Sequence, residues 1–195
     1  DVPSEWKTSL TISALVTGIA FWHYLYMRSM WISTGSSPTV YRYVDWLITV
    51  PLQIVEFYFI LRAVTKVRST LFWQLLISSI VMLVGGYLGE ANYIDRTAGF
   101  VIGMLGWAGV IYLIFVGEAA KASTNSENLA GQKAFKSLRI IVFAGWSIYP
   151  AGYLFAIDSN IELVNIIYNF ADLVNKTTFG LVIWAAAKSD LAKRT

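Results

Sequence analysis

The sequence predicts an all-α protein, a polytopic bundle of six membrane-spanning helices that forms a single domain over residues 1–195. The chain is 56% hydrophobic and only 14% charged, whereas soluble domains carry about 25% charged residues. Long stretches without any charge separate the charged residues. Because a helix rises about 1.5 Å per residue, roughly 20 such residues cross the hydrocarbon core of a bilayer.

Four of the six helices follow from stretches that contain no Asp, Glu, Lys or Arg. These stretches hold twenty residues between Lys7 and Arg28, twenty-one between Arg68 and Glu90, twenty-one between Arg96 and Glu118, and eighteen between Arg139 and Asp158. Two further apolar stretches, 39–61 and 163–187, contain a few charges each. Each of the six is long enough to span a membrane.

The expected helix boundaries follow from these stretches and from the polar residues that flank them. We expect helices at Lys7–Trp31, Thr39–Val64, Thr70–Gly89, Thr97–Ala119, Gly131–Phe155 and Glu162–Ala187. Pro51 lies inside the second helix, which membrane helices tolerate when neighbours satisfy the freed carbonyl. Small residues favour close helix packing, and four glycines follow the fourth helix: Gly99, Gly103, Gly106 and Gly109. Residues 122–132 are polar and predict a loop.

The basic residues predict the orientation of the bundle. If the amino terminus lies in the cytoplasm, only Arg28 and Arg96 fall outside. Eleven others fall on the cytoplasmic side: Lys7, Arg62, Lys66, Arg68, Lys121, Lys133, Lys136, Arg139, Lys188, Lys193 and Arg194. This positive-inside bias predicts that both termini lie in the cytoplasm. It also explains the net charge of +3 by orientation in a lipid bilayer, so the charge does not indicate binding to nucleic acid. The absence of cysteine excludes disulfides, thiol catalysis and cysteine metal sites, and we expect no metal.

Five charged residues lie within the apolar stretches 39–61 and 163–187, where a charge costs about 2.5–3.5 kcal/mol on insertion scales. They are Arg42, Asp45, Glu56, Asp172 and Lys176. A structural ion pair is the alternative for any single pair, but five such residues together indicate a functional site. Asp172 and Lys176 are four residues apart and share a helix face. A lysine at this depth is neutralised, paired with a carboxylate, or joined to an aldehyde as a Schiff base.

The second helix carries the other acidic residues. Asp45 and Glu56 are eleven residues apart, about three turns and roughly 16 Å along one face, and Arg42 lies one turn outward of Asp45. Arg42 and a protonated Lys176 balance Asp45 and Asp172, so we expect Glu56 to be a neutral acid. A neutral acid on the cytoplasmic side, a cationic amine in the middle and an anion on the outer side form a path for protons.

Aromatic residues from three helices lie at depths near the lysine and would fit a long, flat ligand, although each alone is more often a packing residue. They are Trp46, Trp107, Trp146, Tyr149 and Tyr153. Thr49, one turn from Asp45, can place a hydroxyl beside that carboxylate. His23, a single histidine in an apolar helix, is on composition alone more often structural.

Three motifs in order resemble microbial rhodopsins. The segments Arg42–Leu52 (RYVDWLITVPL), Trp146–Pro150 (WSIYP) and Asp172–Lys176 (DLVNK) are similar to the third, sixth and seventh helices of that family, and the match covers nearly the whole chain. The resemblance implies that six of the seven family helices are present and that the family's first helix is missing. It also implies all-trans retinal bound covalently to Lys176 as a Schiff base.

Within the family, the residues are most similar to those of blue-absorbing proteorhodopsins. The resemblance makes Asp45 the proton acceptor, Glu56 the donor and His23 the hydrogen-bond partner of Asp45. Asp172 completes the counterion with Tyr149 as its partner, and Arg42 stabilises both carboxylates. The implied retinal pocket comprises Lys176, Trp46, Thr49, Gln53, Met82, Gly86, Trp107, Trp146, Tyr149, Pro150 and Tyr153. Gln53 falls at the colour-tuning position, where glutamine accompanies blue absorption.

The resemblance implies a light-driven outward proton pump, not an enzyme, in the inner membrane of a bacterium. It also implies a multi-pass homo-oligomer, a pentamer or hexamer, with a cytoplasmic carboxy terminus. Two alternatives remain: a photosensor with the same pocket that signals through a partner, and a proton-coupled transporter without retinal. A sensor needs no carboxylic donor, so Glu56 favours the pump.

Overall fold

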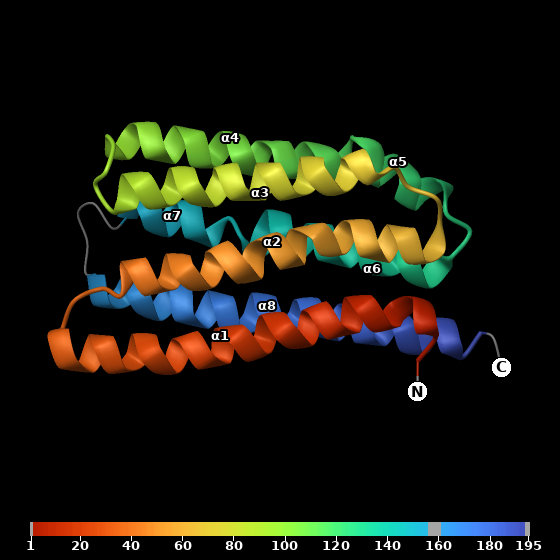
Figure 1. The fold of residues 1–195 in the computed structure, drawn as a ribbon, viewed down its shortest axis with the longest axis horizontal. Coiled ribbons are helices and arrows are strands. Elements are labelled where there is room, and N and C mark those ends of the chain that lie inside the picture. Colours follow the sequence, from red (N-terminus) through yellow and green to blue (C-terminus); the bar gives the residue numbers. More distant parts are fainter. Residues whose placement is uncertain (1, 156–160, 194–195) are drawn as a thin grey trace.

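The computed structural model describes residues 2–155 and 161–193, so Asp158 and Arg194 of the charge pattern lie outside the described residues. Every regular element in the described part is helical, and the helices run side by side as one elongated bundle (Figure 1). This arrangement confirms the prediction of an all-α fold built from six long helical segments.

The first three segments and the last are continuous, whereas the fourth and fifth are each divided. The elements are η1 Ser4–Trp6, α1 Lys7–Thr34, α2 Thr39–Val64, α3 Ser69–Glu90, α4 Arg96–Phe115, α5 Glu118–Asn125, α6 Leu129–Ile140, the π-helical η2 Ile141–Gly145, α7 Ile148–Phe155 and α8 Ile161–Leu191. The amino-terminal start of α1 and the end of α8 lie at the same end of the bundle as α5 (Figure 1).

The predicted loop at 122–132 was wrong for most of its length. Helix α5 continues to Asn125 and α6 begins at Leu129, which leaves only residues 126–128 between them. Ser123 is buried near the end of α5, and the Asn128 side chain caps α6 by accepting a 2.8 Å hydrogen bond from the backbone N–H of Gly131. Polar composition alone does not reveal a cap of this kind.

Five segments are long and apolar enough to cross a membrane: Ser4–Thr34, Thr39–Val64, Ser69–Glu90, Arg96–Asn125 and Leu129–Phe155. Helix α8 is not among these five segments. It has 31 residues, which is long enough to cross a bilayer, but Asp172 and Lys176 at its middle make it less apolar. Helix α2 is the most buried of the five. It therefore occupies the centre of the bundle and carries its polar residues inward.

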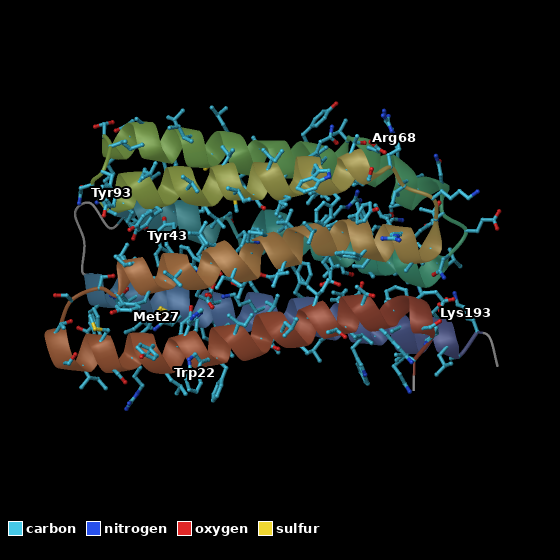
Figure 2. All side chains as sticks on the ribbon, viewed as in Figure 1. Trp22, Met27, Tyr43, Arg68, Tyr93 and Lys193 are labelled. Atoms are coloured by element: carbon cyan, nitrogen blue, oxygen red, sulfur yellow. The ribbon has the colours of Figure 1, made fainter. Side chains whose placement is uncertain are left out.

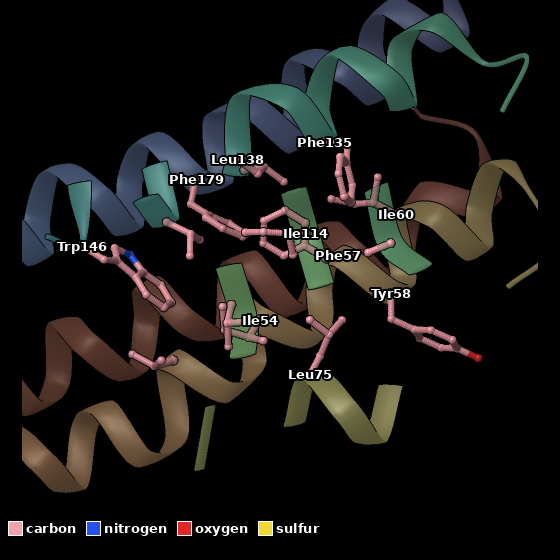
Figure 3. Close-up of a cluster of buried hydrophobic side chains, with 14 of the residues drawn as sticks. Ile54, Phe57, Tyr58, Ile60, Leu75, Ile114, Phe135, Leu138, Trp146 and Phe179 are labelled. Carbon is pink, nitrogen blue, oxygen red and sulfur yellow. The ribbon is translucent and has the colours of Figure 1, made fainter. Parts of the chain in front are cut away.

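An apolar cluster fills the bundle around and beyond the level of Glu56, toward the 65–68 link. The ring of Phe57 on α2 lies 5.2 Å from Phe135 on α6 and 6.2 Å from Phe179 on α8, measured between centroids. Figure 3 shows these rings packed with Ile54 and Ile114, and all five side chains are fully buried. This cluster separates the polar centre of the bundle from that end of the molecule.

Helices α3 and α4 approach each other closely through glycines. A Cβ added at Gly89 would lie 2.9 Å from the Cα of Gly99, and one at Gly85 would lie 2.8 Å from the backbone nitrogen of Gly103. Any side chain at these positions would force the helices apart. The glycines predicted along the fourth helix therefore serve close packing, as membrane helix interfaces commonly do.

Candidate functional site

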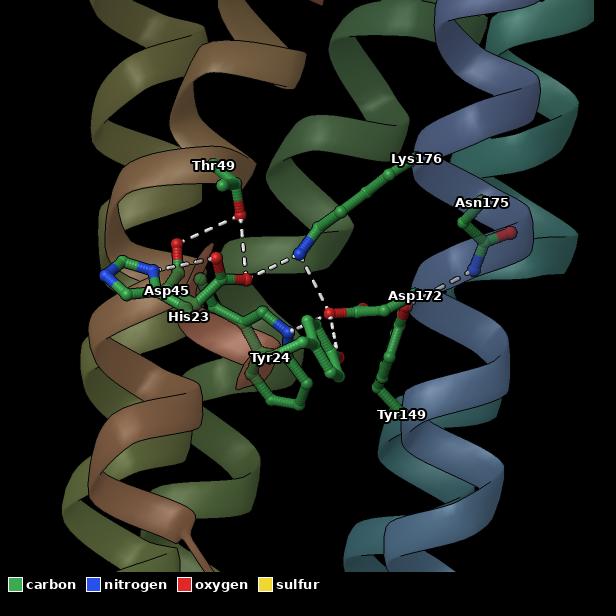
Figure 4. Close-up of polar contacts among 9 residues, drawn as sticks. His23, Tyr24, Asp45, Thr49, Tyr149, Asp172, Asn175 and Lys176 are labelled. Atoms are coloured by element: carbon green, nitrogen blue, oxygen red, sulfur yellow. Dashed lines mark hydrogen bonds and ion pairs between the residues drawn. The ribbon is translucent and has the colours of Figure 1, made fainter. Parts of the chain in front are cut away.

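Lys176 lies at the centre of the bundle, where its amine contacts two carboxylates. Its side chain is only 5% exposed. Its Nζ donates a 2.5 Å hydrogen bond to Oδ2 of Asp45 on α2 and a 2.8 Å hydrogen bond to Oδ2 of Asp172 on α8 (Figure 4). Asp172 shares a helix face with Lys176 because it precedes it by one turn. The predicted acidic partners thus reach the lysine from two helices.

Asp45 is fully buried and has a partner on each carboxylate oxygen. The ring Nδ1 of His23, on α1, lies 3.0 Å from Oδ1. The hydroxyl of Thr49 donates to the backbone carbonyl of Asp45 at 2.9 Å and lies 3.4 Å from Oδ2. In the described residues, Oδ2 of Asp45 therefore has only one donor besides Lys176, and this is the distant hydroxyl of Thr49.

Asp172 is held by three donors besides the lysine. Trp46 Nε1 donates to Oδ2 at 2.9 Å and the Tyr24 hydroxyl donates to the same oxygen at 2.5 Å. The hydroxyl expected from Tyr149 donates to Oδ1, also at 2.5 Å. Hydrogen bonds to an ionised acceptor are roughly twice as strong as neutral ones. Asp172 is therefore a fixed anion site, while Asp45 is the less saturated of the two carboxylates.

Arg42 is buried and contacts two residues of α8. Its Nη2 donates a 2.6 Å hydrogen bond to Oδ1 of Asn165, and its guanidinium carbon lies 5.2 Å from the ring centroid of Tyr168. Within the described residues it forms no ion pair with Asp45 or Asp172. Asn165 lies two turns before Asp172 on the same helix face, so it meets the guanidinium first. The contacts of Arg42 are therefore with Asn165 and Tyr168, and its stabilisation of both carboxylates stays a prediction.

Glu56 is almost completely buried, at 1% exposure, three turns along α2 from Asp45. Neither of its carboxyl oxygens has a hydrogen-bond partner within residues 2–155 and 161–193. The hydroxyl of Ser9 on α1 is a neighbouring polar group that is likewise unpaired there. A buried charge without partners is costly, so this environment favours an uncharged carboxylic acid.

A mostly apolar pocket runs from the lysine between α2, α3, α4, α7 and α8. Its lining includes ten of the predicted pocket residues: Lys176, Trp46, Gln53, Met82, Gly86, Trp107, Trp146, Tyr149, Pro150 and Tyr153. Thr49 is not among the lining residues and contacts Asp45 instead. Within the described residues no second lysine lines the pocket.

The lining of the pocket beside Lys176 suits a flat, apolar ligand. Its walls are aromatic: the Trp46 ring packs edge-on against Tyr149, with 5.1 Å between centroids. A Cβ at Gly86 would lie 3.0 Å from the hydroxyl of Tyr43, so glycine keeps this wall open. The buried Nε2 of Gln53 has no hydrogen-bond partner in the described part and can interact with a ligand. Pockets of this kind, apolar with a few placed polar groups, are typical ligand sites.

Two pocket residues also hold the π-helical segment η2. Trp107 Nε1 donates to the carbonyl of Val142 at 3.2 Å, and the side-chain amide of Asn175 donates to the carbonyl of Gly145 at 3.1 Å. A π-turn displaces backbone carbonyls from the regular helical ladder. These two side chains satisfy such carbonyls and thereby connect η2 to the walls of the pocket.

The sequence reasoning missed three polar residues of the site: Tyr24, Asn165 and Asn175. Tyr24 follows His23 directly, and Asn175 precedes Lys176. Asn165 lies seven residues, or about two turns, before Asp172. A search for uncharged polar residues on the faces of the five buried charges would have identified the two asparagines. Tyr24 has no such signal, because tyrosines are common in membrane helices.

Comparisons with known proteins find matches over almost the whole chain. The model of the bacteriorhodopsin-like protein family matches residues 1–190. The chain is 52% identical to a green-light absorbing proteorhodopsin of Gamma-proteobacterium EBAC31A08 and to a blue-light absorbing proteorhodopsin of Gamma-proteobacterium Hot 75m4. Each alignment covers 95% of this chain and 76% of the relative. The crystal structure of a blue light-absorbing proteorhodopsin from Med12 superposes with a TM-score of 0.84 at 52% identity, covering 97% of this chain and 87% of that one.

Proposed function

The chain belongs to the bacteriorhodopsin-like protein family, and from this membership we propose that it is a light-driven outward proton pump with all-trans retinal on Lys176. Its similarity to proteorhodopsins supports light-driven proton transport. The observation that carries the proposal is the position of the Lys176 amine, which lies between Asp45 and Asp172 while the isolated carboxyl of Glu56 lies further along α2.

Lys176 would hold the retinal covalently through its Nζ, and the aromatic walls of the pocket would enclose the polyene. Trp46, Trp146 and Tyr149 line the pocket near the amine. When bound, retinal supplies absorption of visible light and a light-driven change of shape. The protein supplies the groups that hold and move the proton.

The outward step is proton transfer from Nζ of Lys176 to Oδ2 of Asp45, across the 2.5 Å hydrogen bond between them. Asp45 is a better acceptor than Asp172 because Asp172 already receives hydrogen bonds from Trp46, Tyr24 and Tyr149. A proton that arrived on Asp172 would weaken all of these contacts. His23, bonded to the other oxygen of Asp45, holds the carboxylate in place.

The return step uses Glu56 as the proton source for Nζ of Lys176. A carboxyl group without partners favours its neutral form, and a neutral acid carries the proton that a donor needs. Glu56 lies on the side of the lysine toward the 65–68 link, opposite to Arg42. Transfer is outward if this end faces the cytoplasm, and the basic residues Lys66 and Arg68 in the link support that orientation.

The remaining parts of the proposal concern the setting and the colour. We place the single domain of residues 1–195 in the inner membrane of a bacterium, as a multi-pass pentamer or hexamer with its carboxy terminus in the cytoplasm. Identity to the green-absorbing and blue-absorbing relatives is equal at 52% and does not decide the colour. Gln53, buried in the pocket wall, supports blue absorption.

The test is illumination of a suspension of cells that produce the protein in the presence of retinal. We expect the medium to become acidic in the light and the change to disappear with a protonophore. Asp45→Asn should retain pigment but not acidify the medium. A coloured protein that moves no protons would indicate a photosensor, and a protein that takes up no retinal would indicate a transporter of another kind.

A further inference from the structure

A second hollow lies away from the retinal pocket, as an open groove at the end of the bundle where α5 lies. It is bordered by the link between α2 and α3 and by the α4–α5 junction. Three cations line it: Lys66 and Arg68 from the link and Lys121 from α5. Gln74 and Tyr112 add neutral polar groups to the same groove.

The positive charge of this groove is only partly compensated. Within residues 2–155 and 161–193, none of Lys66, Arg68 and Lys121 forms an ion pair. Glu118 is the one acidic residue that lines the groove, so the lining carries a net charge of +2, three cations minus one anion. Like charges gathered in one place repel each other, and an anion bound among them would relieve that repulsion.

The groove lies at one end of the bundle, beside large side chains that are exposed on the spanning helices. Near the groove, Val116 directly after α4 is 61% exposed and Trp73 on α3 is 58% exposed. Large apolar side chains exposed on a spanning helix contact lipid chains. Figure 2 shows Arg68 at the same end, with its side chain directed outward from the bundle. A cationic groove therefore lies directly beside a lipid-facing apolar surface.

We propose that this groove binds the headgroup of an anionic phospholipid of the phosphatidylglycerol class, in the membrane leaflet that meets this end of the bundle. The phosphodiester would be received by Lys66, Arg68 and Lys121. Guanidinium and ammonium groups form charge-assisted hydrogen bonds with phosphate oxygens. The acyl chains would lie against the exposed surface of α3 and α4. Basic pockets between spanning helices on the cytoplasmic side are suited to anionic lipids.

The proposal differs from a general attraction to an anionic surface, and the chain offers the control that separates them. Arg62, Lys133 and Lys136 are exposed basic residues on α2 and α6 that do not line the groove. Removing them lowers the charge of the same end by the same amount. A diffuse surface attraction depends on total charge, whereas a built site depends on the three groove residues.

The experiment measures the lipids retained by the purified protein, reconstituted in nanodiscs of phosphatidylglycerol and phosphatidylcholine in equal amounts and released for native mass spectrometry. We expect the protein to retain phosphatidylglycerol in preference to phosphatidylcholine. The variant K66Q/R68Q/K121Q should lose this preference by on the order of tenfold, and R62Q/K133Q/K136Q should keep it. Glu118→Gln, which removes the groove's acidic residue, should strengthen retention. The visible absorption band checks that each variant is folded.

Three outcomes would overturn the proposal. Equal losses in the two triple variants would mean that total charge governs binding and that the groove is not a site. Unchanged retention in K66Q/R68Q/K121Q would place the bound lipid elsewhere. Displacement of the retained lipid by millimolar inorganic phosphate would show a site for a free anion rather than for a lipid headgroup.

Discussion

Nζ of Lys176 on α8 donates a 2.5 Å hydrogen bond to Oδ2 of Asp45 on α2, so two residues 131 positions apart form the closest ion pair of the site. Asp172 accepts from the same amine at 2.8 Å. The two carboxylates are not equivalent, because Asp172 receives three further donors while Asp45 faces His23 and Thr49. Changes at each of these residues should therefore have distinct effects.

Replacing Lys176 should abolish the pigment. Lys176→Arg keeps a cation between the two carboxylates, but a guanidinium does not form the covalent link to retinal, so we expect a folded and colourless protein. Lys176→Ala should also be colourless, and it should be less stable by about 3–5 kcal/mol because it leaves two buried carboxylates without their cation. Absorption spectra with excess retinal test both, with Lys188→Ala as a coloured control. A visible band in Lys176→Arg would contradict the attachment site.

Glu56→Gln should slow the recovery of the resting state while leaving the dark spectrum nearly unchanged. The amide preserves the size of the side chain but removes the proton source, and general acid catalysis contributes roughly 10²–10⁴-fold to a rate. Flash photolysis measures the recovery, and azide, a small diffusible proton donor, should restore it. Glu127→Gln, at an exposed position in the 126–128 link, is the matched control. An unchanged photocycle in Glu56→Gln would leave Glu56 with a structural role only.

Tyr24→Phe tests a contact that the sequence did not predict. The hydroxyl of Tyr24 donates a 2.5 Å hydrogen bond to Asp172, and a hydrogen bond to a charged group contributes about 1.5–3 kcal/mol. We expect a loss of stability of this size, seen as faster bleaching in SDS. Tyr26→Phe changes an exposed tyrosine two residues away and should have little effect. Equal bleaching rates in the two variants would show that the Tyr24 hydroxyl does not support the site.

Gln53→Leu should shift the absorption maximum to longer wavelength. Excitation moves positive charge from the lysine end of the chromophore toward its ring. A dipole beside the polyene that favours the ground-state distribution therefore widens the energy gap, and removing it narrows the gap. Gln53 lines the pocket and its Nε2 is unpaired in the described part. Gln74→Leu, at an exposed position, should leave the maximum unchanged. A blue shift in Gln53→Leu would mean that its amide does not act on the chromophore in this way.

The helices could be predicted because a bilayer allows few charges inside it. The charge-free stretch from Arg68 to Glu90 therefore reproduces α3, which spans Ser69–Glu90. The break between Phe115 and Glu118 and the π-helical segment at Ile141–Gly145 could not be predicted in this way. They depend on contacts made by other helices, such as the hydrogen bond from Trp107 to the carbonyl of Val142, which hydropathy does not encode.

The same distinction holds for the site. The placement of Asp45 and Asp172 around Lys176 follows from helical spacing and from the balance of charges. The partner of Arg42 does not follow from the sequence pattern. Its hydrogen bond to Asn165 depends on the relative rotation and translation of α2 and α8. Rotation or translation of one helix against another leaves the sequence pattern unchanged. The contacts between helices could therefore be identified only from the structure.

The last prediction concerns the dependence of colour on pH, and it rests on His23 and Asp45 together. An ionised Asp45, 2.5 Å from Nζ of Lys176, stabilises positive charge at the amine in the ground state. Protonation of Asp45 removes that stabilisation and narrows the gap to the excited state. We therefore expect absorption to move to the red on acidification. Outward pumping should fail in the acidic form, because the acceptor already carries a proton.

Two variants separate the contributions to this transition. Asp45→Asn has no titrating group at the acceptor position and should show the red-shifted spectrum at every pH. His23 lies 3.0 Å from Asp45, so His23→Asn removes a polar neighbour of this carboxylate and should change the pH dependence of the colour without abolishing it. A spectrophotometric titration of the three proteins measures both effects. An absorption maximum that stays constant from acid to alkaline pH in the unmodified protein would refute Asp45 as the titrating counterion, and with it the outward route through this carboxylate.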